Sequence, residues 1–88
     1  MKKIKLSCGY EGKIDERVTN DFDILWKLRK VDKDLNCLFE VLNKLFGSDE
    51  EIDKLVECLK DEDGYVDNEK LTDAILETFN ALGDAGKN

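Results

Sequence analysis

A run of apolar side chains between residues 35 and 46 constrains this chain more than any other feature. Its members recur at the i, i+3, i+4 and i+7 spacing of one face of an α-helix: Leu35, Leu38, Phe39, Leu42, Leu45 and Phe46. Gly47 follows at the position where a helix commonly ends in the left-handed conformation. The pattern predicts an amphipathic helix of about three turns, whose apolar side must be covered.

The same helix carries apolar residues on a second side. Cys37 and Val41 lie off the main stripe, so the helix has more apolar surface than one facing element covers. Two interpretations stay open: other helices enclose the segment, or part of it is a surface for a partner. The second interpretation makes five residues candidates for partner binding, namely Cys37, Leu38, Val41, Leu42 and Leu45.

Residues 1–14 have the pattern of a β-hairpin. Ile4, Leu6 and Cys8 alternate with polar residues, and Gly9 and Gly12 then provide turn chemistry. A lone hairpin is marginal in water, so we expect it to lean on the helices. Residues 15–20 form a connector with at most one helical turn.

A helix is expected to begin near Asp21, capped by Thr19 or Asn20. It is apolar on two sides, which favours a central position in the domain. Trp26 invites a role as a binding anchor, but its place on the Phe22–Leu25 stripe favours core packing.

Two further helices complete the pattern. Ser48 and Glu51 have the spacing of a capping box, before a stripe made of Ile52, Leu55, Val56 and Leu59. Asp67 is the expected N-cap of the last helix, whose stripe runs to Leu82 before Gly83. The fold class is therefore mainly α: one compact domain (1–88) of about four helices, with a hairpin at 1–14, a helical core at 20–82 and a mobile tail at 83–88.

The acidic segment from Asp61 to Asp67 resembles a calcium loop at first sight. With Gly64 at loop position 6 of an EF-hand, Leu59 takes position 1 and Lys70 takes position 12, where the bidentate glutamate belongs. Too few ligand oxygens remain, so we expect no calcium site. A structural interpretation fits better: Gly64 allows a left-handed turn, Val66 packs beneath it, and Asp67 caps the following helix.

Composition argues against several functions. The net charge of −7 repels a phosphate backbone, so we expect no nucleic-acid binding. The chain has no histidine and no visible set of nucleophile, base and orienting residue, so we expect no enzyme, no cofactor and no metal. No stretch is long enough to span a membrane, and no secretion signal is visible. Cys8, Cys37 and Cys58 are widely spaced, which favours reduced thiols in a cytoplasmic protein.

Two segments resemble the tail assembly chaperones of long-tailed bacteriophages. They are the run from Leu42 through Leu45-Phe46-Gly47 to Leu55, and the run from Cys58 through Asp61-Glu62-Asp63-Gly64 to Leu71. The resemblance covers roughly residues 20–82. It implies a phage or prophage protein that binds and solubilises the tape measure protein in several copies, helps to recruit tail tube subunits, and has no catalytic activity. We also expect the chain to associate with itself.

Two other classes remain open. One is a degenerate EF-hand-like calcium module. The other is a small acidic regulator or inhibitor that mimics nucleic acid or blocks a host enzyme. The carboxylates are interleaved with lysines along each helix, which argues against a mimic.

Overall fold

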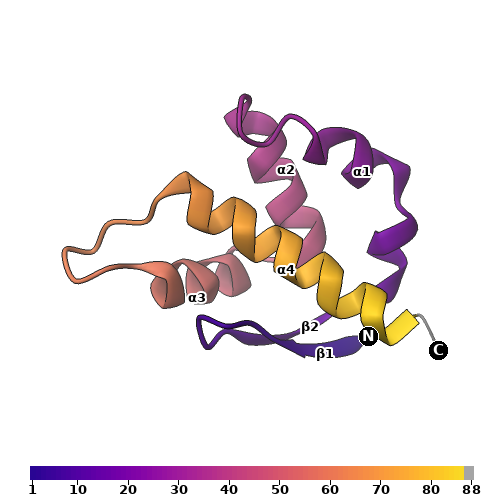
Figure 1. Ribbon diagram of the computed structural model, residues 1–88, viewed down its shortest axis with the longest axis horizontal. Helices are drawn as coiled ribbons and strands as arrows, with labels where there is room; N and C mark the ends of the chain where they lie inside the picture. The colour runs from indigo at the N-terminus through magenta and orange to yellow at the C-terminus, as the bar shows by residue number, and fades with distance from the viewer. Residues whose placement is uncertain (87–88) are drawn as a thin grey trace.

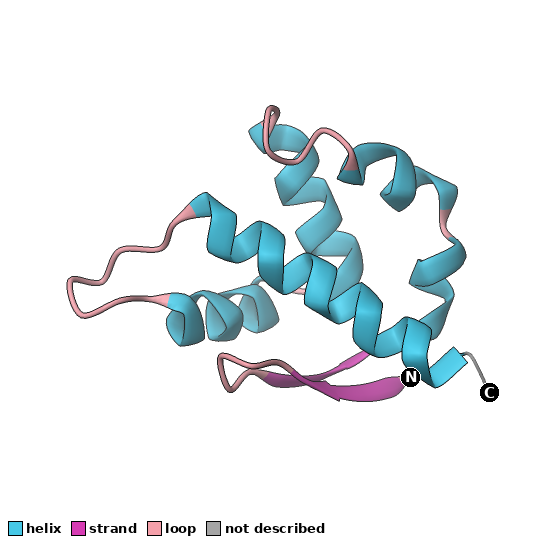
Figure 2. Ribbon diagram, viewed as in Figure 1, coloured by secondary structure: helices cyan, strands magenta, loops and turns pink. Residues whose placement is uncertain are grey.

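The computed structural model describes the backbone of residues 1–86 and the side chains of residues 1–83 (Figure 1). Its elements in chain order are β1 (Lys2–Lys5), β2 (Glu11–Ile14), the 3₁₀ helix η1 (Glu16–Asn20), α1 (Phe22–Leu28), α2 (Leu35–Phe46), α3 (Asp49–Leu59) and α4 (Asn68–Gly86). Helices make up most of the fold, and the two strands lie together along one side (Figure 2). The predicted mainly α fold with a hairpin at its start is confirmed.

The hairpin is amphipathic and uses the helices as its support. Its strands pair antiparallel, with Ile4 opposite Gly12, and Gly9 takes a φ of 107° in the turn. Apolar side chains of the hairpin enter the core, namely Ile4, Leu6, Tyr10 and Ile14. Most of its lysines point to solvent. This burial stabilises a two-stranded sheet that would be marginal alone.

Tyr10 joins the hairpin to α2 and α3. Its ring packs edge-on against Phe46, with centroids 5.5 Å apart, and its hydroxyl donates a hydrogen bond to Oε1 of Glu51 at 2.8 Å. Gly12 lies beneath the tyrosine, where an added Cβ would come 2.3 Å from the phenolic oxygen. The ring can therefore lie flat against the strand only because residue 12 has no side chain.

The core lies where α2 meets its neighbours. α2 packs against α1, α3 and β2, and α4 packs against β1, η1 and α3. In Figure 1, α4 crosses the front of the molecule, and the loop from α3 to α4 projects at the left. Thr78 of α4 is the one fully buried polar residue among those described, and its hydroxyl donates to the carbonyl of Ala74 at 2.8 Å.

The predicted caps of α2 and α3 form in part. Gly47 has a φ of 85° after α2, as expected. Ser48 accepts a hydrogen bond from the backbone N–H of Glu51 at 3.3 Å. The carboxylate of Glu51 binds Tyr10 and Lys54 instead of returning to Ser48, so only half of the capping box is present.

The predicted end of the last helix is too early. α4 continues through Gly83 to Gly86, because a single glycine only weakens a helix, by about 1 kcal/mol relative to alanine. Residues 87–88 of the predicted tail lie outside the described residues. The predicted mobility of residues 83–88 stays a prediction.

Candidate protein-binding surface

Four of the five side chains proposed for partner binding lie in the core. Leu38, Val41, Leu42 and Leu45 are each less than 5% exposed. Cys37 alone is half-buried, and burial, followed by the charge of Asp34, raises the pKa of its thiol. Of the two interpretations of α2, enclosure by other elements holds for these four residues, and binding through them would require the domain to open.

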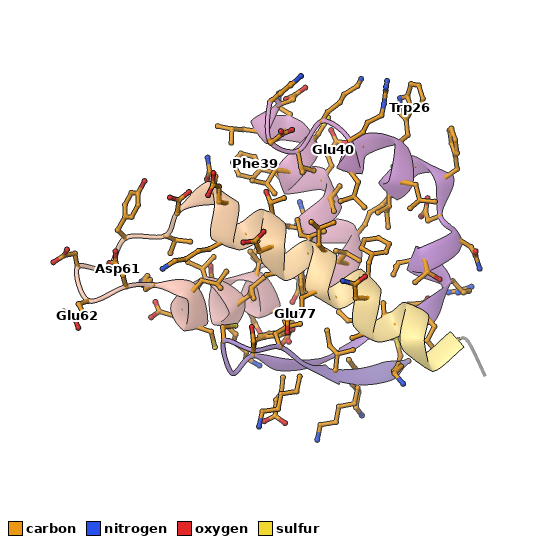
Figure 3. The ribbon with its side chains drawn as sticks, in the orientation of Figure 1. Trp26, Phe39, Glu40, Asp61, Glu62 and Glu77 are labelled. Carbon is orange, nitrogen blue, oxygen red and sulfur yellow. The ribbon has the colours of Figure 1, made fainter. Side chains whose placement is uncertain are left out.

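The exposed apolar residues of α2 lie on the stripe predicted to be buried. Leu35 is 51% exposed and Phe39 is 52% exposed, one turn apart on the same side of the helix. Figure 3 shows Phe39 on the side of α2 away from Trp26. The core side of α2 is therefore centred nearer Val41 than the spacing of the leucines suggested.

α1 carries the largest exposed aromatic feature. Phe22 is 72% exposed, Leu25 is 45% exposed and Trp26 is 47% exposed. The rings of Phe22 and Trp26 stack at 5.8 Å with an interplanar angle of 25°, and the guanidinium carbon of Arg29 lies 3.8 Å from the Trp26 ring centroid. We name Phe22, Leu25, Trp26 and Arg29 the α1 aromatic face.

The geometry of this face preorganises its side chains. Phe22 precedes Trp26 by about one turn and Arg29 follows it by about one turn, so the three stack along the helix axis. Stacking and the cation–π contact each contribute roughly 0.5–1.5 kcal/mol at such sites. Figure 3 shows Trp26 projecting away from the body of the domain. The face is thus both ordered and open to solvent.

The predicted central position of α1 is wrong. Only Ile24 of this seven-residue helix is fully buried, and Asp21, not Thr19 or Asn20, is the N-cap. Asp21 accepts hydrogen bonds from the backbone N–H groups of Asp23 and Ile24 at 2.9 and 3.4 Å. A two-turn helix can bury one side only, so its second apolar side faces water. Trp26 is consequently a surface residue, contrary to the prediction of core packing.

Ion pairs hold α1 on α2. Lys27 pairs with Asp23 on its own helix and with Glu40 of α2, and Lys44 of α2 pairs with Asp23 at 2.9 Å and with Asp21 at 3.3 Å. Hydrogen bonds from Lys44 and Lys27 lower the pKa of Asp23. The hydrogen bond to Glu40 and then that to Asp23 raise the pKa of Lys27. This network fixes the position from which α1 presents its aromatic face.

An open pocket of about 420 Å³ lies beside α1. Val18 and Ile24 provide its apolar floor, and its charged rim consists of Asp15, Arg17, Asp21 and Lys44. Two ion pairs already engage that rim, Asp15 with Arg17 at 2.6 Å and Asp21 with Lys44. The pocket has the size and lining to receive one apolar side chain, and its charges are neutralised locally.

The acidic turn uses its oxygens to organise its own backbone. Oδ1 of Asp61 accepts from the N–H groups of Asp63 and Tyr65, both at 2.9 Å. The hydrogen bond from Tyr65, and then that from Asp63, lower the pKa of Asp61. The turn projects from the domain, and Figure 3 shows Glu62 at its outer end.

The structural roles predicted for this turn are confirmed. Gly64 has a φ of 80°, Val66 packs partly buried against the core, and Asp67 accepts from the N–H of Glu69 at 2.9 Å. Across the described part of the chain, no three acidic or cysteine side chains are grouped in a way that could hold a metal ion.

Sequence reasoning singled out Trp26 but placed it inside. The usable signal was helix length: Asp21 and the charged residues after Leu28 leave room for about two turns, too few to bury two apolar sides.

Within residues 1–86, no helix is both long enough and apolar enough to cross a membrane. No family model, curated protein or solved structure matches this chain.

Proposed function

We propose that this chain is a non-catalytic protein-binding domain, and that it serves as a tail assembly chaperone for a tape measure protein. The α1 aromatic face carries the binding part of the proposal. Its three apolar side chains expose on the order of 300 Å² together, the size of surface patch that is often functional on a monomer. Tryptophan and arginine are also the side chains most enriched among residues that dominate binding energy.

The shape and charge of the surface favour an apolar helix as the occupant. α1 is a short exposed ridge, and the apolar stripe of a partner helix can pack along such a ridge. Arg29 and Lys30 are the cations beside Trp26, with Lys30 Nζ 5.7 Å from the ring centroid. Acidic residues that flank the partner's stripe would therefore be favoured.

The resemblance of residues 20–82 to tail assembly chaperones supports the identity of that partner. A tape measure protein is long and helical, and several copies of a small domain can bind along it. The formal charge of −7 would keep the coated partner soluble in the host cytoplasm. Leu35 and Phe39 form a second exposed pair on α2, which leaves a separate surface for tail tube subunits or for another copy of the chain.

Co-expression with a tape measure protein tests the proposal. We expect the partner's soluble yield to rise and a complex to co-purify. Two leucines of nearly equal exposure provide a matched comparison: Leu25 is 45% exposed on α1, and Leu76 is 49% exposed on α4. Leu25→Ala and Trp26→Ala should weaken the complex at least tenfold, whereas Leu76→Ala should leave it unchanged.

Two results would count against the proposal. If the wild-type chain neither solubilises nor co-purifies the tape measure protein, the chaperone role fails. If Leu25→Ala and Leu76→Ala weaken a real complex equally, the role stands but the α1 aromatic face is not the docking surface. Circular dichroism of each variant separates lost binding from lost folding.

A further inference from the structure

Hydrogen bonds hold the turn of the hairpin against α3 and α4. Ser7 donates from its backbone N–H to Glu77 of α4 at 2.6 Å and from its hydroxyl to the same carboxylate at 2.9 Å. On the other side, Tyr10 binds Glu51 of α3. Residues 7–10 are thereby held at a defined place over α3. Cys8 is one of them.

Cys58 lies on the same side of α3 as the residues that meet the hairpin. Glu51, Leu55 and Cys58 follow the i, i+4, i+7 spacing, and Leu55 is fully buried. Cys8 packs against the core and lines a pocket of about 200 Å³ together with Leu59, the residue after Cys58. Two thiols distant in sequence therefore lie on the two sides of one interface, between the turn of the hairpin and the end of α3.

The electrostatics of Cys58 agree with this placement. Burial and then the charge of the neighbouring Cys8 thiol raise the pKa of Cys58. Cys58 also contributes to the raised pKa of Tyr10, after burial and the hydrogen bond to Glu51. The third thiol is elsewhere: Cys37 lies on α2, with its sulfur 3.7 Å from a carboxylate oxygen of Asp34.

We propose that Cys8 and Cys58 form an intramolecular disulfide when the folded protein meets a low-molecular-weight disulfide such as oxidised glutathione, and that Cys37 remains a thiol. The exposed Cys58 thiolate attacks one glutathione sulfur and releases the first glutathione as a thiolate. The Cys8 thiolate then attacks the Cys58 sulfur of the mixed disulfide and releases the second. Two protein thiols lose two protons and two electrons, and one glutathione disulfide becomes two glutathione thiols.

Folding makes the second step intramolecular. The bond closes a loop of roughly 50 residues, which lowers the conformational entropy of the unfolded chain far more than that of the folded chain. We expect the midpoint of thermal unfolding to rise by about 10 °C or more, and a reductant to reverse the rise. The raised pKa of Cys58 predicts a slow reaction near neutral pH that accelerates as the pH rises.

Peptide mapping gives a direct readout. The reduced full chain is incubated with oxidised glutathione at pH 8.5, blocked, and digested with trypsin without reduction. Cleavage after lysine places Cys8 in Leu6–Lys13, Cys58 in Leu55–Lys60 and Cys37 in Asp34–Lys44. The expected product has lost two hydrogens, joins the first two peptides, and leaves the third with a free thiol.

Matched variants and a denatured control complete the test. Cys37→Ser should form the same bond at the same rate, whereas Cys8→Ser and Cys58→Ser should each stop at a glutathione adduct. In urea the bond should form at least tenfold more slowly than in the folded chain. Equal rates in both conditions, stable adducts on both cysteines, a Cys58–Cys58 dimer as the main product, or a lower unfolding midpoint would each overturn the proposal.

Discussion

Leu42→Ala would delete most of a buried side chain in the middle of α2, where Leu42 is 4% exposed. Removing a buried leucine destabilises a domain by about 2–5 kcal/mol, because transfer energy is lost and a cavity remains. Small domains have roughly 5–15 kcal/mol in total. With a urea dependence of about 1 kcal/mol per molar for a chain of this size, the unfolding midpoint should fall by about 2–5 M.

Phe39→Ala on the same helix is the matched control. Phe39 is 52% exposed, so its replacement should destabilise by roughly 1 kcal/mol or less and move the midpoint by about 1 M or less. Both variants are followed by circular dichroism in urea, with unchanged slopes as the sign of two-state unfolding. Equal shifts, or a larger shift for Phe39→Ala, would refute the placement of the core on the Val41 side of α2.

Further predictions concern single positions. Gly12→Ala should destabilise the domain by about 1–3 kcal/mol, because its Cβ would collide with Tyr10. Gly83→Ala has nothing within 4 Å of its added Cβ and should stabilise α4 by up to about 1 kcal/mol. Thermal unfolding of both variants checks these two expectations. Thr78→Val should change stability by less than about 1 kcal/mol in urea, because the lost hydroxyl only bonds back to its own helix. Millimolar calcium should not raise the unfolding midpoint over a chelator control, since Asp61 already binds its own turn; a saturable rise would contradict this.

Much of the fold could be predicted from the sequence because its signals are local. The spacing of its leucines predicts α2, and Gly47 predicts where that helix ends. Ser48 and Asp67 predict the starts of α3 and α4. Which side of an element is buried depends on its neighbours, and this is where prediction failed. Phe39 lies on the same apolar stripe as Leu42, yet α1, α3 and β2 meet the helix about Val41.

The candidate binding surface was the least predictable part. The i, i+4 spacing of Phe22 and Trp26 is the same whether a helix lies inside or on the edge of a domain. The shortness of α1 means that it buries one side only, but which side that is depends on how α1 packs on α2, where the ion pairs of Lys27 and Lys44 join charged side chains of the two helices. A single sequence does not reveal those partners, because the pairs join residues of two helices across a loop.

The hydrogen bonds between Ser7 and Glu77 connect residues 70 positions apart, and this sets an order of events during synthesis. The hairpin, α1, α2 and α3 can form local structure as they leave the ribosome, but the core stays open on one side until α4 follows. Ile4, Leu6 and Ile14 would remain partly uncovered during that interval, since α4 packs on β1. A nascent chain stalled before Asn68 is therefore expected to aggregate and to be susceptible to proteases. Once α4 leaves the ribosome, it packs on the hairpin and completes the core in one step.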